Sequence, residues 1–307
     1  METSPESFYS SYIKEYHEVK ANYLFTLLND IEKTNENLKC KELIKEDVSL
    51  SLTNNTKFIL QTDLRQNYFH CIETFFEFFF AFLPNNEIVP DNSKIVRQLV
   101  KANWQKNYKR IEQIANGKMK LNFLDQEIED IEHNVTIGHY LFYPGTYAKG
   151  KFDNNWYQMV SESIENIKNV IKILASDFCP RDEYNAYKHT MRAYPNYQSL
   201  HLLDLETKEE KLSFDISNSI SFQIYNDKEK ETIVNTKMLD PQRDFDMTKQ
   251  CSRLIHNMVE LRNVMFNRNQ KNGNNKVAIL LFGEDNVAES SKHNVDIQDL
   301  SFSTKIV

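Results

Sequence analysis

One stretch of the sequence, "IETFFEFFFAFLP" at residues 72–84, constrains the fold more than any other. It lies in a segment whose apolar residues recur at the period of an α-helix, and Pro84 ends that helix. From residue 75 onward the helix is apolar nearly all round, which is typical of a helix that is covered on every side. Exposed to water, such a run would be an aggregation patch. We therefore expect five phenylalanines in a core: Phe75, Phe76, Phe79, Phe80 and Phe82.

The hydrophobic period predicts helices before Pro195 and strands after it. Helical period covers six segments before that proline: 8–37, 56–84, 91–118, 121–134, 154–178 and 181–194. Residues 138–153 hold three of the six glycines and are predicted to be a loop. Beyond Pro195, alternation at period two predicts an antiparallel meander. Its strands cover 199–206, 211–217, 219–226 and 231–239. A helix over 246–270 and strands over 276–282 and 300–307 complete the prediction.

These elements predict an α+β protein, a mostly helical bundle with an antiparallel β meander in the C-terminal third. We expect the bundle over residues 1–195, with its core at 55–195. The meander, the long helix and the C-terminal strands, residues 196–307, then pack on the bundle.

Composition excludes several classes of protein. The six glycines form neither GxGxxG nor GxxxxGK[ST], and GxSxG and HExxH are absent too, which removes the main support for nucleotide-binding, hydrolase and zinc-protease sites. Four scattered cysteines predict reduced thiols rather than a disulfide framework. A secretory signal is not visible and the apolar run at 75–83 is too short to span a membrane, so a cytoplasmic protein is expected. The net charge of −7 leaves room only for a local basic patch.

A polar stripe in "RDEYNAYKHTMR", residues 181–192, is the first candidate site. On a helix Arg181, Asn185, His189 and Arg192 fall within an arc of about 80°. A histidine can take or give a proton, an arginine stabilises charge on phosphate, and an asparagine can orient either. This set suits cleavage of RNA through its own 2′-hydroxyl, with no metal and no cofactor. The structural alternative is a helix that shows this face to water and turns its tyrosines inward.

A second candidate wall lies in "RQNYFHCIE" at residues 65–73 and comprises Arg65, His70 and Glu73. His70 and Glu73 are three apart, a spacing that permits shared metal ligation. A di-iron bundle needs two such units and the sequence has no second one, so a metal is not predicted. The structural alternative is a partly buried helix whose charged residues pair internally.

The stripe resembles the signature of HEPN-type domains, helical bundles of bacterial toxins, CRISPR effectors and phage-defence proteins. That signature is an arginine, a polar residue and a histidine five to seven positions on, in a late helix. Arg181, Asp182 and His189 are similar, with a gap one residue longer. A second alignment uses Asn185 and His189 and places Tyr184 where the arginine should be. "RQNYFH", Arg65 to His70, matches the spacing but lies in an early helix.

The resemblance, over residues 55–195, implies a metal-independent endoribonuclease of a bacterial defence or toxin–antitoxin system. It implies a homodimer with sites that face each other across the interface. His189 would be the acid or base, Arg181 or Arg192 would hold the scissile phosphate, and Asn185 would orient. HEPN-like domains also occur as inactive scaffolds that bind RNA or a regulatory protein partner, which is the alternative function. A third hypothesis is a small-molecule binder whose meander closes a pocket on the aromatic bundle.

Overall fold

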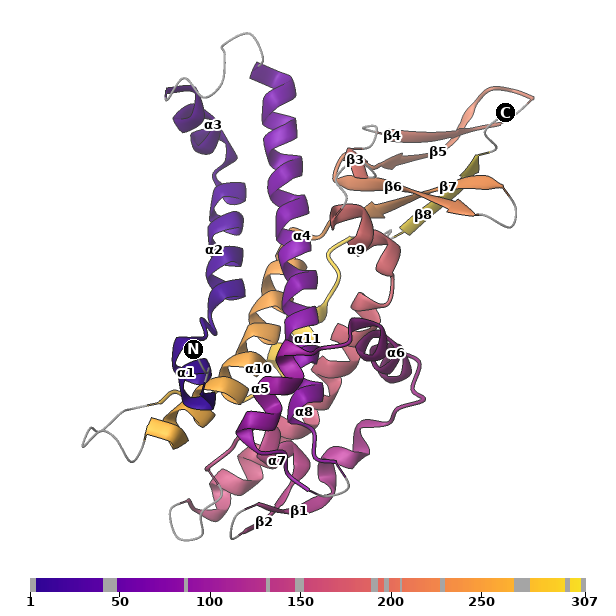
Figure 1. Cartoon of the computed structure of the whole chain (residues 1–307). Coiled ribbons are helices and arrows are strands. Elements are labelled where there is room, and N and C mark those ends of the chain that lie inside the picture. The colour runs from indigo at the N-terminus through magenta and orange to yellow at the C-terminus, as the bar shows by residue number, and fades with distance from the viewer. Residues whose placement is uncertain are drawn as a thin grey trace. The chain divides into compact units, whose positions relative to one another are not determined.

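The structure, a computed structural model, shows the predicted α+β class (Figure 1). Helices make up most of the chain, and all but two of the described strands follow Lys188. The structure describes residues 4–40, 49–85, 88–130, 133–146, 152–188, 193–195, 199–204, 206–226, 230–267, 277–295 and 299–304.

The chain divides into two compact units, each assembled from three separate stretches of sequence. Unit 1 comprises Met1–Val19, Phe69–Cys179 and Asp246–Lys292. Unit 2 comprises Lys20–Tyr68, Pro180–Phe245 and His293–Val307. Three long helices contribute residues to both units: α2 (Tyr16–Asn29), α4 (Ser49–Phe82) and α10 (Pro241–Asn267). The division predicted at residue 195 does not coincide with this partition, because each unit takes residues from both sides of it.

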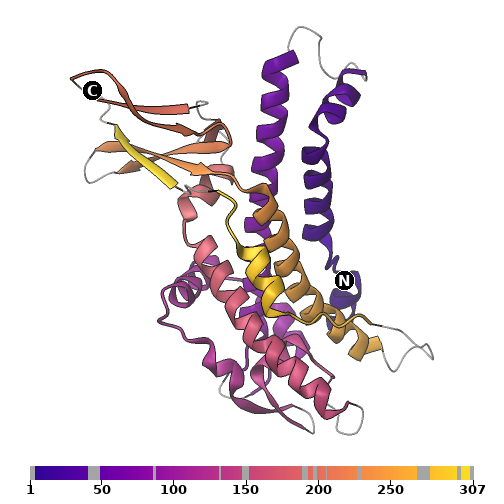
Figure 2. The same ribbon diagram turned by 180° about the vertical axis from the view of Figure 1, so that it is seen from behind.

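Unit 1 is the helical body of the protein. Besides its parts of the three long helices it contains α1 (Pro5–Ser11), α5 (Asn92–Val100), α6 (Trp104–Ala115), α7 (Ile137–Phe142), α8 (Asn154–Phe178) and α11 (Glu284–Ser291). A short 3₁₀ helix, Leu121–Asp125, precedes a hairpin of β1 (Glu127–Asp130) and β2 (His133–Thr136). Figure 2 shows α11 alongside α8 and α10, and the side-chain amide of Gln250 donates to the hydroxyl of Ser290 to hold it there.

The core of unit 1 is built around the aromatic end of α4, as the sequence predicts. Phe75, Phe76, Phe79, Phe80 and Phe82 are all buried. The ring of Phe79 lies 5.7 Å from that of Phe75 and 6.3 Å from that of Phe142 in α7, between ring centroids. Edge and offset contacts of this kind add to the stabilisation from apolar burial.

Unit 2 combines helices with the strands of the meander. Its helices are α3 (Ile31–Cys40) and α9 (Arg181–Lys188), together with parts of the long helices. One antiparallel sheet has the order β3 (Ala193–Pro195), β6 (Ser219–Asn226), β7 (Glu231–Met238) and β8 (Asp299–Thr304). A separate hairpin pairs β4 (Ser199–Leu203) with β5 (Glu210–Asp215). Helix α9 packs against β6 (Figure 1).

Two predicted long helices are broken in the structure. Residues 8–37 form α1, α2 and part of α3 rather than one helix. Residues 91–118 form α5 and α6, because the side chain of Asn103 accepts the amide N–H of Lys106 and starts a new helix. An asparagine in an apolar helical period is a recognised N-cap residue, and this signal is what the single-helix prediction overlooked.

Three further predictions around short elements are wrong. The helix over 121–134 is replaced by the 3₁₀ turn and the β1–β2 hairpin, in which Ile128 pairs with Val135 and both are buried. The loop over 138–153 begins instead with α7, whose N-cap Thr136 accepts the amide N–H of His139. The helix over 181–194 does not reach its end, since residues 193–195 are extended, as the residue before a proline prefers.

The strand predicted over 276–282 is also wrong, and the reason bears on how unit 1 is held together. Residues 277–283 run outside any strand, and side chains satisfy their backbone groups. Asn257 bonds both the N–H and the C=O of Leu280, at 3.1 and 2.7 Å. Ser163 accepts the N–H of Phe282 at 2.7 Å, and Asn166 donates to its carbonyl. Buried backbone groups need partners, and here α8 and α10 supply them in place of a neighbouring strand.

Candidate functional sites

Helix α9 carries part of the predicted polar stripe. Its buried side is formed by Glu183, Tyr184, Ala186 and Tyr187. Asn185 is half-buried, and Lys188 is exposed, with its ammonium group 4.0 Å from the ring centre of Tyr184. The two tyrosines are therefore buried, as in the structural alternative for the stripe, and Asn185 is less buried than they are.

The other members of the stripe are only partly visible. His189 and Arg192 lie outside the described residues. Arg181 is described by its backbone, which opens α9 directly after Pro180. The convergence of Arg181, Asn185, His189 and Arg192 into one site therefore stays a prediction.

Arg65 of α4 is the centre of a buried ion cluster in unit 2. Its Nε donates to Oε1 of Glu183 in α9 at 2.9 Å, and its Nη1 donates to Oδ1 of Asp244 in α10 at 2.6 Å. The hydroxyl of Tyr187 donates to the same Oε1 of Glu183 at 2.9 Å. Lys237 of β7 lies 3.2 Å from Oε2 of Glu183. The cluster joins α4, α9, α10 and β7, and Lys237 also lies 3.3 Å from Oδ1 of Asp299 in β8.

Burial and charge act against each other at the two carboxylates. At Glu183 burial raises the pKa, but Arg65, Lys237 and the hydrogen bonds outweigh it, so that the pKa falls below its ordinary value. At Asp244 burial is the stronger effect and raises the pKa to about 6, although Arg65 pulls it down. Arg65 therefore holds one permanent anion and one carboxyl group that titrates near neutrality.

This geometry gives Arg65 an internal role. Arg65 is 8% exposed and its guanidinium is shared by two buried carboxylates, so it is not offered to a phosphate. The structure shows Arg65 paired internally, which is the structural alternative stated for this helix above. His70 and Glu73 are half-buried and belong to unit 1, whereas Arg65 belongs to unit 2. Within the described ranges, no cluster of three or more His, Cys, Asp or Glu is placed to hold a metal ion.

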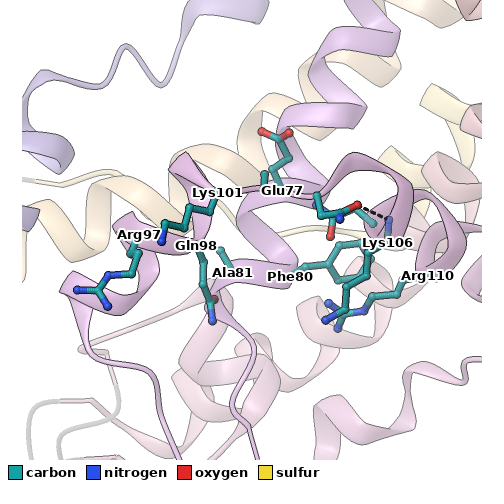
Figure 3. A pocket seen from close by; sticks show the side chains of 11 residues that line it. Glu77, Phe80, Ala81, Arg97, Gln98, Lys101, Lys106 and Arg110 are labelled. Carbon is teal, nitrogen blue, oxygen red and sulfur yellow. Dashed lines mark hydrogen bonds between the residues drawn. The ribbon is translucent and has the colours of Figure 1, made fainter.

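A basic pocket in unit 1 was not anticipated from the sequence. Its volume is about 320 Å³, and it lies between the end of α4, helix α5 and the start of α6 (Figure 3). Figure 3 shows Lys106 and Arg110 from α6 on one side, and Arg97, Gln98 and Lys101 from the α5 segment on the other. Glu77 is the one carboxylate in the lining, against four cations.

The four pocket cations, Arg97, Lys101, Lys106 and Arg110, make no ion pair with any carboxylate in the described part of the chain. The guanidinium of Arg110 lies over Phe80, 3.9 Å from the ring centre. Burial lowers the pKa of Arg110, which shows that this cation is partly desolvated without a compensating anion. The pocket therefore presents positive charge that no carboxylate among the described residues pairs with.

Interaction with a helix dipole explains two of the four pocket cations. Arg97 and Lys101 lie at the C-terminal end of α5, where cations complement the helix dipole. Lys106 lies in the first turn of α6, where a cation opposes the dipole. Lys106 and Arg110 are also a like-charge pair at i,i+4, which destabilises a helix. The sequence signal was present, since residues 91–118 hold seven Lys or Arg and two Asp or Glu.

A third arrangement lies on the β4–β5 hairpin. The Nε2 of His201 is 2.7 Å from the hydroxyl of Ser199, and its Nδ1 is 2.9 Å from Oε2 of Glu210. The order nucleophile, base and orienting carboxylate is that of a hydrolytic triad. His201 and Glu210 are about half exposed, so water competes for each of these hydrogen bonds. We interpret the group as a polar cross-strand cluster on the surface of the hairpin.

Comparisons with known proteins leave the function open. No family model, no curated protein sequence and no solved structure matches the chain. Among the helices that the structure describes, none combines the length and the apolar character that a membrane crossing requires.

Proposed function

We propose that the chain is an RNA-binding protein of the scaffold type and that the basic pocket of unit 1 holds the RNA backbone. The observation that carries this proposal is the group of four cations, Arg97, Lys101, Lys106 and Arg110, around a cavity of about 320 Å³. In a chain with a net charge of −7, such a concentration of positive charge on one surface is the electrostatic footprint of a polyanion site.

The arrangement favours phosphate groups as the ligand. A phosphate between Lys106 and Arg110 relieves their repulsion and gives Arg110 an anionic partner. The pocket lining includes Ala102 and Asn103 at the start of α6, where the helix dipole adds positive potential. An RNA strand offers several phosphates in a row, and four separated cations can contact more than one of them.

The test compares two charge-matched double variants. Lys101→Gln with Lys106→Gln removes two lysines that line the pocket, and Lys94→Gln with Lys109→Gln removes two exposed lysines of the same helices that do not. Binding of a fluorescent single-stranded RNA is measured by anisotropy as a function of salt. Four phosphate contacts give a slope of log K against log salt of about −3, and each lost contact reduces it by about 0.7.

The pocket variant is expected to weaken binding and flatten the salt dependence, while the matched control binds like the wild type. A single-stranded DNA of the same sequence separates RNA recognition from binding of any polyanion. Equal affinities for both double variants would contradict the proposal.

A second candidate function is the His189-assisted endoribonuclease of a bacterial defence or toxin–antitoxin system. It is favoured by the half-buried Asn185 on a helix that the Arg65 cluster fixes from its buried side. The assay is digestion of mixed RNA in the presence of chelator by the wild type and by His189→Ala. Loss of general acid–base assistance lowers the rate by about 10²- to 10⁴-fold. Equal cleavage by both proteins removes His189 from the mechanism, and sedimentation of the same samples tests the homodimer.

A further inference from the structure

An exposed tryptophan lies directly beside the basic pocket. Trp104 is the first residue of α6 and follows Asn103 of the pocket lining. It is 51% exposed, and Val100 at the end of α5 is 82% exposed. They flank the short connection, residues 101–103, that carries Lys101. An apolar edge therefore borders the four cations.

The chain's other tryptophan, Trp156, is less exposed. The indole N–H of Trp156 donates to the carbonyl of Thr146 at 3.2 Å, and its ring stacks on Phe152 with centroids 5.3 Å apart. Trp104 leaves about half of its surface in water, the larger exposed fraction of the two. Proteins that bind single strands combine cations that follow the backbone with aromatic rings on which bases stack.

We propose that Trp104 is a stacking platform for an unpaired base and that the pocket is selective for single-stranded RNA. This inference rests on the proposed function, since it needs a backbone held by Arg97, Lys101, Lys106 and Arg110. A base that is paired within a duplex is already stacked and presents no face to Trp104. Single strands therefore gain the contact that duplexes cannot make.

The experiment uses the full chain with three probes of stated chemistry. These are a fluorescent single-stranded RNA, the same RNA annealed to its complement, and inorganic polyphosphate as a competitor without bases. Trp104→Ala removes the platform and Trp104→Phe keeps an aromatic face. We expect Trp104→Ala to weaken binding of the single strand by about 5- to 140-fold, the equivalent of one stacked base, and Trp104→Phe to retain most of the affinity.

Duplex RNA and polyphosphate provide the readouts that a merely structural role of Trp104 would not separate. Their affinities should be unchanged by Trp104→Ala. In a Trp156→Phe background Trp104 is the sole tryptophan, and its fluorescence should be quenched by the single strand and not by polyphosphate. Thermal unfolding of each variant, followed by circular dichroism, checks that the chain is folded.

The outcomes separate this inference from the proposed function. If the Lys101 and Lys106 variant loses RNA affinity while Trp104→Ala binds single strands like the wild type, RNA binding stands and the stacking inference is overturned. Equal loss for single strand, duplex and polyphosphate also overturns it, because the tryptophan then shapes the pocket. If the lysine variant keeps full affinity, the proposed function fails as well.

Discussion

Arg65 and Glu183 are joined by a hydrogen bond of 2.9 Å although 118 residues of sequence separate them. The bond links α4 to α9, and Asp244 extends it to α10, 179 residues from Arg65. Both carboxylates are almost completely buried. A buried ion pair contributes little net stability when intact, but removing one member leaves an uncompensated charge inside the protein.

Arg65→Ala should therefore destabilise the protein strongly, by about 3–5 kcal/mol. Arg65→Lys should recover only part of the loss, since an ammonium group cannot bridge two carboxylates as a planar guanidinium does. Urea unfolding followed by circular dichroism measures the change. Arg97→Ala, at an exposed position, is the control and should leave the midpoint nearly unchanged. A midpoint for Arg65→Ala close to that of the control would show that the cluster is dispensable.

The raised pKa of Asp244 predicts a dependence of stability on pH. The pKa of Asp244 is about 6 in the folded state, against an ordinary value of 3.8. Between these two pH values the folded state keeps a proton on Asp244 that the unfolded state has lost. The contribution of Asp244 therefore falls as the pH rises through this window, by about 3 kcal/mol in total. At Glu183, whose pKa is lowered, the pH dependence of stability has the opposite sign, because the stabilisation from Glu183 is lost as the pH falls.

The measurement is the free energy of unfolding of the wild type and of Asp244→Asn at several pH values. The wild-type curve alone does not isolate Asp244, because burial lowers the pKa of His139 to about 4 and makes stability rise with pH below 6.5. The wild type should lose stability relative to Asp244→Asn as the pH rises from 4 to 7. Parallel curves for the two proteins would mean that Asp244 titrates normally.

Phe79 is predicted to contribute strongly to the stability of the unit 1 core. It is fully buried, and its ring contacts those of Phe75, Phe123 and Phe142. Phe79→Ala should cost about 3–5 kcal/mol, from lost apolar burial and from the cavity that remains. Thermal unfolding measures this, with Val100→Ala at an exposed position as the comparison. An unchanged melting temperature would rule out a core position for Phe79.

Ser163→Ala tests the side-chain scaffold of residues 277–283. The hydroxyl of Ser163 lies 2.6 Å from that of Tyr143 and accepts the amide N–H of Phe282. Its loss leaves a buried N–H without that acceptor, so we expect a cost of about 1–3 kcal/mol and faster hydrogen exchange at Phe282. Ser161→Ala, on the exposed side of the same helix, is the matched control. Equal exchange in both variants would mean that Ser163 does not hold the segment.

Long, strongly periodic elements could be predicted from the sequence, and short ones could not. The aromatic helix α4, the amphipathic α8 and the strands β6 and β7 follow directly from their periods. The β1–β2 hairpin was missed because Ile128 and Val135 are seven residues apart, a spacing that places them on one face of a helix, whereas in the structure they pair across two short strands. Residues 277–283 have the apolar sequence of a strand. The sequence does not reveal that their backbone groups bond to side chains of α8 and α10 rather than to a neighbouring strand.

The candidate sites show the same limit. Sequence reasoning singled out Arg65 but could not name Glu183 and Asp244 as its partners, because only the fold brings together residues so far apart. The basic pocket depends on the break between α5 and α6, and the continuous helix predicted there concealed it. On α9, Tyr184 and Tyr187 are buried, as the structural alternative for the stripe has them.

The interleaving of the two units along the chain has a consequence for synthesis on the ribosome. Translation delivers residues from the N-terminus onward, yet unit 1 needs Asp246–Lys292 and unit 2 needs His293–Val307, including the strand β8 that pairs with β7. Neither unit can close while the nascent chain is still short of those residues. The aromatic end of α4 meets Phe123 and Phe142 early in synthesis, but Arg262 of α10, whose guanidinium lies over Phe82, is made only 180 residues after that ring. The core of unit 1 is therefore completed only after α10 has left the ribosome.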